Sequence, residues 1–256
     1  MKKTFLLSCL MLAAMPVMAA YTGHVYVDKN KNGVFDQSEK PLAGIKVSDG
    51  LNVVETAADG SFTLPGHERE RFIFITTPSG YKTFNRHYHK IEKKQSGYDF
   101  GLIPYSGRIR KDGSHRYIHI TDTEIFNTEN HADWVNNVRD YARNEQAAFI
   151  IHTGDICYEK GLKAHIKLMN TENMDCPVFY CIGNHDLVKG KYGEELFESI
   201  YGPVYYSFDA GNVHYVVTPM PGGDHAPGYT SDDVCRWLKN DLAHIRPGTP
   251  VVVVNH

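Results

Sequence analysis

The sequence of 256 residues is long enough for one large domain or two modest ones, and 42% hydrophobic with 22% charged residues is ordinary for a globular protein. Its formal net charge of −3 provides no basic field of the kind that binds nucleic acid, so we expect no nucleic-acid partner. After the N-terminus, no segment reaches the roughly 20 apolar residues of a membrane-spanning helix, and we expect no transmembrane segment.

The N-terminus has the pattern of a secretory signal. Two lysines precede an apolar stretch over residues 5–14, and the segment ends in Ala19 and Ala20, where a signal peptidase would cleave. We therefore predict a signal peptide over residues 1–20 and export to the periplasm or the extracellular space. Four cysteines remain after cleavage, so disulfides are allowed in that compartment, with buried free thiols as the alternative.

The next part of the chain, residues 21–105, predicts a small all-β sandwich domain. Short alternating stretches are separated by turn pairs such as Asn-Gly and Asp-Gly, a rhythm typical of antiparallel sandwiches. The predicted strands are residues 22–27, 44–47, 53–56, 61–64 and 71–76. A glycine-containing basic segment over residues 106–114 predicts a linker.

The connection after the first predicted strand has the spacing of a twelve-residue calcium loop. Its alternate positions and its end carry oxygen-bearing side chains: Asp28, Asn30, Asn32, Asp36 and Glu39, with Gly33 at the sharp turn. Calcium prefers six to eight oxygen ligands, which these side chains and a backbone carbonyl can supply. The flanking segments predict strands, so the loop would not belong to a helix-loop-helix sensor. The alternative is a polar turn without an ion, because only three of the side chains are carboxylates.

Residues 115–256 predict a second domain, in which strands and helices alternate. Its first strands are predicted at residues 117–121, 147–153 and 178–182, with helices at 132–145 and 162–170 between them. Crossovers of this length predict parallel strands covered by helices. The remaining elements are predicted strands at 201–209 and 212–218, a helix capped by Thr230, and a buried strand at 250–256.

Each of the first three strands of this domain is followed by polar residues. The first precedes Asp122 and Glu124, the second Asp155, and the third the run Asn184, His185 and Asp186. Neighbouring strands lie about 4.8 Å apart, so ligands at equivalent strand ends can converge on two ions about 3.5 to 4 Å apart. An amide, an imidazole and a carboxylate in succession can supply a metal ligand, a proton donor and a group that orients the donor. An ordinary turn is the alternative for that run.

In these motifs the sequence resembles the calcineurin-like metallophosphoesterase superfamily, in its secreted bacterial type with an N-terminal prealbumin-like sandwich. The signature of that family is an Asp-x-His strand end, then Gly-Asp, then Gly-Asn-His followed by Asp or Glu, then a lone His, then Gly-His-x-His. The resemblance implies an α/β fold, an α+β sandwich of the calcineurin-like type, preceded by the small all-β domain. It covers that domain and roughly the first two thirds of the catalytic domain.

The resemblance also implies an activity, the hydrolysis of phosphate mono- or diesters by a hydroxide that two divalent metal ions (Mn, Fe or Zn) activate. By position, the implied metal ligands are Asp122, Asp155, Asn184 and His256. Glu124 stands where the usual motif has His, and as a hard ligand it would favour manganese or magnesium. His185 would protonate the leaving group and Asp186 would orient it.

One departure from the family concerns the Gly-His-x-His stretch, which does not occur before His256. The resemblance therefore implies that the full-length gene product supplies the missing strands, and that the chain as given binds metal poorly. The competing interpretation is a catalytically impaired, secreted binding or adhesion protein that retains the phosphoesterase fold and is stabilised by calcium. Metal-stimulated hydrolysis of a phosphate ester would distinguish the two.

Overall fold

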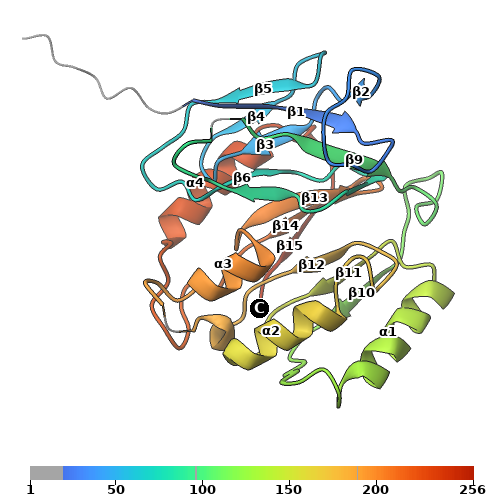
Figure 1. Ribbon diagram of the computed structural model, residues 1–256, viewed down its shortest axis with the longest axis vertical. Coiled ribbons are helices and arrows are strands. Elements are labelled where there is room, and N and C mark those ends of the chain that lie inside the picture. The colour runs from blue at the N-terminus through green and yellow to red at the C-terminus, as the bar shows by residue number, and fades with distance from the viewer. Residues whose placement is uncertain (1–19, 96, 189) are drawn as a thin grey trace, which may run out of the picture.

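The computed structural model describes residues 20–95, 97–188 and 190–256, so all of the predicted signal peptide except Ala20 lies outside the described residues. Two modules are stacked on one another (Figure 1). Strands β1 to β9 form the N-terminal module at the top of the view, and the later elements form the second module beneath it. None of the described helices is both long and apolar enough to span a membrane.

The N-terminal module is a sandwich of two sheets. The first sheet contains β1 (Tyr21–Val27), β2 (Lys40–Pro41), β5 (Ser61–Leu64), β7 (Tyr81–Thr83) and β9 (Phe100–Pro104). The second has the order β4-β3-β6-β8, with bounds Val53–Glu55, Lys46–Ser48, Phe72–Ile75 and Tyr88–Lys90. Alternate side chains of both sheets are buried between them. The sheets are not wholly antiparallel as predicted, because β1 and β9 pair in parallel.

The second module begins with three parallel strands in the order β10 (Tyr117–Ile120), β11 (Phe149–His152) and β12 (Val178–Tyr180). The crossovers between them contain α1 (Ala132–Asn144) and α2 (Tyr158–Leu168). A short 3₁₀ helix, Asn184–Asp186, follows β12. Parallel neighbours must be joined by crossovers, and these helices bury their apolar faces against the sheet.

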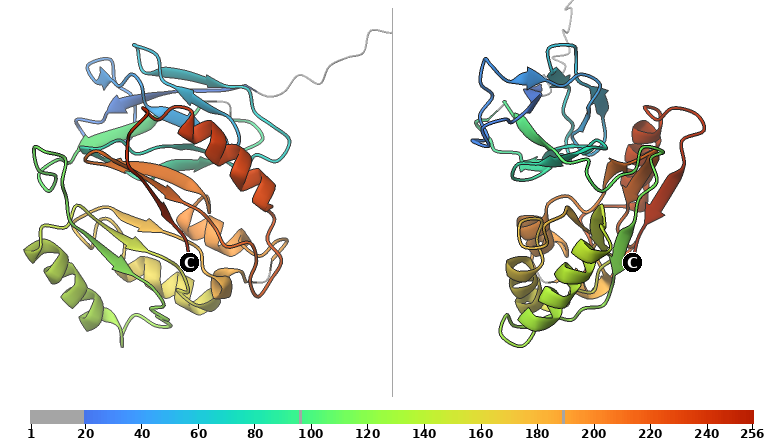
Figure 2. Two further views of the ribbon diagram at one scale, coloured as in Figure 1. Left: turned by 180° about the vertical axis from the view of Figure 1, so that it is seen from behind. Right: turned by 90° about the vertical axis from the view of Figure 1, so that its right-hand side faces the viewer.

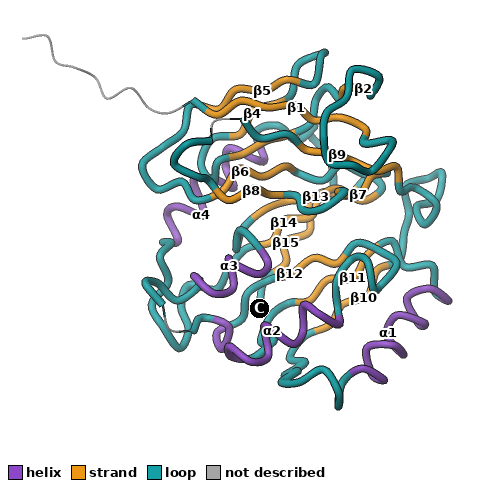
Figure 3. The backbone as a smooth tube through the Cα atoms, in the orientation of Figure 1, coloured by secondary structure: helices purple, strands orange, loops and turns teal. Residues whose placement is uncertain are grey.

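A second three-stranded sheet follows, in the order β13 (Tyr206–Ala210), β14 (Val213–Val217) and β15 (Val251–Val254). The short helix α3 (Glu195–Tyr201) precedes it, and α4 (Ser231–Leu242) connects β14 to β15. Thr230 caps α4 by accepting a hydrogen bond from the backbone of Asp233. Helices α2 and α4 lie on opposite sides of the two sheets (Figure 2), and Figure 3 shows the same succession of helices and strands along the chain.

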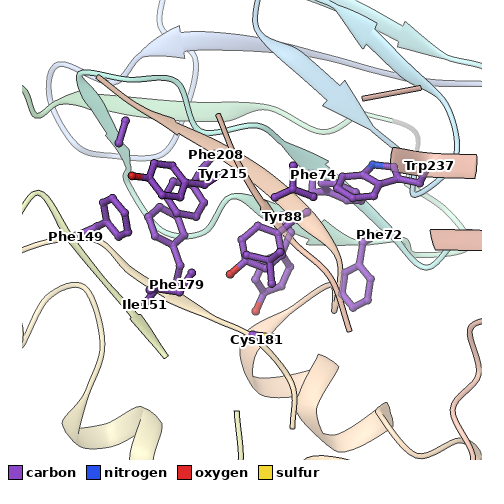
Figure 4. Close-up of a cluster of buried hydrophobic side chains, with 14 of the residues drawn as sticks. Phe72, Phe74, Tyr88, Phe149, Ile151, Phe179, Cys181, Phe208, Tyr215 and Trp237 are labelled. Atoms are coloured by element: carbon purple, nitrogen blue, oxygen red, sulfur yellow. The ribbon is translucent and has the colours of Figure 1, made fainter. Parts of the chain in front are cut away.

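Stacked aromatic rings join the two sheets of the second module (Figure 4). The ring of Phe179 on β12 stacks on that of Phe208 on β13 with centroids 3.6 Å apart, and Phe208 stacks on Tyr215 of β14 at 5.0 Å. The edge of Phe149 from β11 contacts Phe208 at 5.0 Å. All four rings are buried, so the two sheets share one apolar core.

The last strand differs from the prediction. Residues 250–256 were expected to form a buried strand, but Val251 and Val253 of β15 are 41% and 55% exposed. Within the described part of the chain, β15 pairs only with β14, so it is an edge strand. Four β-branched residues predict a strand well, but they do not reveal how many neighbours it has.

Helix α4 and strand β13 connect the two modules. Trp237 of α4 is fully buried against Phe74 of the N-terminal module, with ring centroids 6.2 Å apart. The hydroxyls of Thr76 and Ser207 lie 2.8 Å apart across the same boundary. The N-terminal module therefore packs directly on the second sheet.

Candidate metal centre

Three predicted ligands from separate parts of the chain lie together. Ligand atoms of Asp122, Asp155 and His256 are all within 4.8 Å of one another. Asp122 follows β10, Asp155 follows β11, and His256 follows β15 of the other sheet. Because β10 and β11 are parallel neighbours, their ends share one edge of the sheet, and Figure 2 shows the C-terminus reaching the same region.

The ring of His256 is held in the tautomer that a metal needs. Its Nδ1 lies 2.8 Å from the backbone oxygen of Thr153, which can only accept a hydrogen bond, so Nδ1 carries the proton. The other ring nitrogen, Nε2, then faces Oδ2 of Asp155 at 3.3 Å. Two lone pairs directed at one another repel unless a cation or a proton lies between them. This donor set fits a divalent cation, and the Thr153 carbonyl is the outer partner that orients the ligand.

The backbone of the two acidic loops is strained. Asp122 and Asp155 have φ angles of 52° and 50°, in the left-handed region that side chains other than glycine rarely adopt. Glu124, on the same loop as Asp122, has φ of 45°. Such conformations persist where the surrounding structure enforces them, most often at functional sites.

A pair of glycines brings the loops after β11 and β12 into contact. A Cβ atom on Gly183 would lie 2.2 Å from the backbone nitrogen of Asp155 and 2.2 Å from its Oδ1. A Cβ atom on Gly154 would lie 2.4 Å from the nitrogen of Gly183. Only glycine allows this approach, which places the carboxylate of Asp155 beside the Asn184–Asp186 turn.

Replacing Gly183 with alanine is expected to push the two loops apart and to lower the free energy of unfolding by about 1 to 3 kcal/mol. Urea unfolding measures the change. Gly107→Ala is the matched control, because a Cβ atom there meets nothing within 4 Å. Equal stability of the two variants would show that the close approach is unimportant.

His185 lies beside this cluster, with its ring partly open to solvent. Its backbone N–H donates to Oδ1 of Asp155 at 3.0 Å, and its Nδ1 lies 2.9 Å from Oδ2 of Asp224. The hydrogen bond to Asp224 raises the pKa of the imidazole, which favours the protonated form. The ring can therefore hold a proton at the edge of the candidate centre, in the manner of a general acid.

Asp186 makes different contacts from those we expected. We predicted that it orients His185, but Asp224 contacts that ring instead. Asp186 is fully buried, and its carboxylate accepts hydrogen bonds from the backbone N–H groups of Gly183, Ile156 and Cys157. Burial raises its pKa, and these hydrogen bonds oppose that shift. Asp186 therefore ties the loop after β11 to the loop after β12.

No motif or spacing in the sequence singles out Asp224. It lies on the long connection between β14 and α4, in a Pro-Gly-Gly-Asp run that predicts only a turn. Its backbone N–H donates to the oxygen of Asn184 at 3.1 Å, which holds the connection against the 3₁₀ helix. Contact between segments 39 residues apart depends on the folded course of that connection.

The remaining predicted ligands stand outside the three-residue group. Glu124 is exposed, and Asn184 is half-buried at the start of the turn that contains His185. Two histidines on the strands that lead to the centre contact threonine hydroxyls. His119 Nε2 contacts the hydroxyl of Thr153 at 2.8 Å, and His152 Nε2 contacts that of Thr123 at 2.9 Å.

The cysteines near the centre are thiols. Within the described part of the chain all four are free, and only Cys235 is exposed. Burial raises the pKa of Cys157 to about 12, so its thiol stays protonated and is a poor nucleophile. The predicted calcium loop, residues 28–39, lies between β1 and β2 of the other module.

Comparison with protein-family models agrees with this organisation. Residues 115–256, more than half of the chain, match the model described as Calcineurin-like phosphoesterase. Residues 29–104 match the model described as N terminal of Calcineurin-like phosphoesterase. No curated protein matches the chain. From the longer match, the chain belongs to the calcineurin-like phosphoesterase family.

Proposed function

We propose that the chain hydrolyses phosphate mono- or diesters with the help of two divalent cations bound at the centre described above. The observation that carries the proposal is the convergence of Asp122, Asp155 and His256 within 4.8 Å. Family membership supports metal-dependent phosphoester hydrolysis in general. When bound, divalent cations neutralise the phosphoryl oxygens and lower the pKa of a coordinated water.

Asp155 is the residue we propose to be shared by both cations. Its Oδ2 faces Nε2 of His256, while its Oδ1 receives the N–H of His185. Asp122 would add a second carboxylate to the same group. Glu124 and Asn184 are the candidates for completing the second ion's ligands, since both follow strands that end at this edge. Carboxylate and amide oxygens suit manganese or magnesium better than softer metals.

His185 is the proposed proton donor. Its ring projects from a turn whose backbone is anchored to Asp155, so it lies next to any phosphate held at the centre. Asp224 binds Nδ1, which leaves Nε2 to give its proton to the leaving alcohol. The ring of Tyr158 lies 5.4 Å from the imidazole in a tilted arrangement.

Hydrolysis of p-nitrophenyl phosphate and of bis(p-nitrophenyl) phosphate, measured with and without manganese, tests the proposed function. The expected result is manganese-stimulated release of nitrophenol that a chelator abolishes, and the preferred substrate distinguishes a mono- from a diesterase. Turnover that persists in excess chelator would contradict the proposal. Absence of turnover with every divalent metal would favour the catalytically impaired binding protein.

Replacing Asp224 with asparagine is expected to slow hydrolysis of phenyl phosphate about 10-fold, because the ring of His185 loses the carboxylate that orients it. The effect should be smaller for p-nitrophenyl phosphate, whose more acidic alcohol needs less protonation. Comparison of kcat for the two substrates measures the difference. An equal loss on both substrates would assign Asp224 a purely structural role. If Asp224 acts through His185, adding Asp224→Asn to His185→Gln should cost nothing further.

A further inference from the structure

The loop of residues 28–39 carries a set of oxygen ligands that the proposed function does not use. It connects β1 to β2 in the N-terminal module, whereas the C-terminus lies in the second module (Figure 1). Its oxygen-bearing side chains are Asp28, Asn30, Asn32, Asp36 and Glu39. Lys31 and Gly33, with φ of 58° and 72°, turn the backbone sharply between them.

Two of the three carboxylates are buried without a cationic partner. Asp28 is 1% exposed and Glu39 is 7% exposed. Among the described residues, no ion pair involves Asp28, Asp36 or Glu39. Buried carboxylates are normally paired with a cation or coordinate a metal ion.

Backbone N–H groups donate to these carboxylates but leave some acceptor positions of their oxygens unused. Asp28 accepts the N–H groups of Asn32 and Gly33, at 3.2 and 2.9 Å. Glu39 accepts those of Lys29 and Asp36, at 2.8 and 3.2 Å. An ionised carboxylate offers about four acceptor positions, so each retains lone pairs for a further partner.

The two asparagine amides converge on the third carboxylate. The side-chain nitrogens of Asn30 and Asn32 lie 2.7 and 3.0 Å from Oδ2 of Asp36. The amide oxygens of Asn30 and Asn32 accept the backbone N–H groups of Asn32 and Val34, at 3.1 and 2.8 Å. Both amides therefore lie against the carboxylate of Asp36, and a half turn of an amide would direct its oxygen at that carboxylate in exchange for its backbone hydrogen bond.

A buried hydroxyl next to the loop has no partner. Tyr26 is fully buried, and its hydroxyl makes no hydrogen bond among the described residues. A Cβ atom on Gly101 would lie 3.0 Å from Oδ2 of Asp28 and 3.2 Å from this hydroxyl, so both oxygens border one small space that only glycine leaves open. Burial and then the charges of Asp28 and Glu39 raise the pKa of Tyr26, which keeps the hydroxyl protonated as an unsatisfied donor.

The same tyrosine links the loop to the sandwich. Phe35, near the end of the loop, packs on the ring of Tyr26 with centroids 4.8 Å apart. His24, which is on β1 like Tyr26, has its ring 5.1 Å from that of Phe35. A loop held in one conformation therefore packs its Phe35 against β1, and β1 pairs with β2, β5 and β9.

We propose that residues 28–39 bind one calcium ion through the side chains of Asp28, Asn30, Asn32, Asp36 and Glu39, and that this ion stabilises the N-terminal module. A water coordinated by the ion would give the Tyr26 hydroxyl its missing partner. The donor set consists of oxygens alone, on a loop long enough for the six to eight ligands of calcium. Magnesium requires a stricter octahedron, and softer metals prefer nitrogen or sulfur.

Calorimetric titration of the full chain with calcium tests the proposal, with all variants in an Asp155→Asn background so that the candidate catalytic centre does not contribute. The expected result is one site, with an affinity at least about tenfold weaker in Glu39→Gln and in Asn30→Ala, because each removes a ligand. Asn30 is exposed, so its replacement should leave the fold intact. Asp59→Asn is the matched control, since Asp59 is an exposed turn carboxylate of the same module.

Thermal unfolding gives the second readout. Saturating calcium should raise the melting temperature by about 5 °C or more in the Asp155→Asn and Asp59→Asn proteins. The rise should be lost in the Asn30→Ala and Glu39→Gln proteins. Absence of calcium binding in the Asp155→Asn protein, or binding that survives both loop variants unchanged, would overturn the proposal. Either result leaves the hydrolytic function untouched, because that function is measured at the other site.

Discussion

Replacing His214 with alanine is expected to lower the free energy of unfolding by about 3 to 5 kcal/mol, the usual effect of breaking a buried ion pair by removing one partner. His214 is fully buried between two carboxylates, with Nδ1 2.6 Å from Asp209 and Nε2 2.8 Å from Asp241. Without the ring, both carboxylates lose the cation that lies between them. Urea unfolding at neutral pH measures the loss.

The effect should be large because this cluster also joins the two modules. Asp241 of α4 accepts the hydroxyl of Ser207, which contacts Thr76 of the N-terminal module. Asp209 lies 3.3 Å from the ammonium of Lys46, on the same module. A variant that disturbs His214 therefore weakens the contact between the modules as well as the second sheet.

The same histidine makes stability depend on pH. Hydrogen bonds to Asp209 and Asp241 outweigh burial and raise the pKa of His214 to about 9. A folded-state pKa above the unfolded value gives stability that is complete below the unfolded pKa, about 6.5, and is lost as pH rises through the folded one. The free energy of unfolding should thus fall by about 3 kcal/mol from pH 6.5 to above pH 9.

His244→Ala is the matched control for both measurements. His244 also contacts a carboxylate, that of Glu55 at 3.2 Å, but its side chain is 30% exposed and that of Glu55 49%. A pair this open to solvent contributes about 1 kcal/mol or less. Two results would show that His214 is not a buried cation between carboxylates. The His214→Ala protein would be as stable as the His244→Ala protein, or its stability would depend on pH in the same way as that of the unaltered chain.

Replacing Asp155 with asparagine is expected to reduce kcat/KM for phosphate esters more than about 100-fold, since loss of even an outer-shell partner of a metal ligand costs 10- to 100-fold. Asparagine retains the oxygen that accepts the His185 N–H, so the turn should stay in place. What is lost is the charge that faces Nε2 of His256. Initial rates and manganese affinity, measured in parallel, should fall together.

Asp112→Asn serves as the control for that experiment. Asp112 is exposed before β10 and bonds to Ser114, and its replacement should leave rates and metal affinity unchanged. Full activity of the Asp155→Asn protein would show that Asp155 is not a required ligand of the metal centre. A fall in rate with unchanged manganese affinity would show that Asp155 acts on the substrate and not on a cation.

The sequence predicted the fold where local patterns determine the structure. Three apolar strands with helical crossovers must lie in parallel, so their polar ends must share an edge, and Asp122 and Asp155 do lie together there. The capped helix after Thr230 followed from its capping box. The division of the second module into two sheets was implied only by the resemblance to a sandwich fold and not by the residues themselves, because a strand does not encode which sheet it joins.

The parts of the candidate site that the sequence did not predict depend on long-range contacts. Asp186 follows His185 directly, which suggested that it orients the ring, yet in a 3₁₀ turn the two side chains point in different directions. The carboxylate that does contact the ring, Asp224, comes from a connection without periodicity. The buried cluster around His214 depends on strand register, which pairs it with Asp209 across a hairpin.

The most direct test of the account is the position of manganese in a crystal of the chain soaked with that metal. Two anomalous-scattering peaks about 3.5 to 4 Å apart are expected, both next to the carboxylate of Asp155, one of them next to Asp122 and the other next to Nε2 of His256. A peak held by other residues, or no peak between these three side chains at saturating manganese, would contradict the assignment of this group as the metal centre.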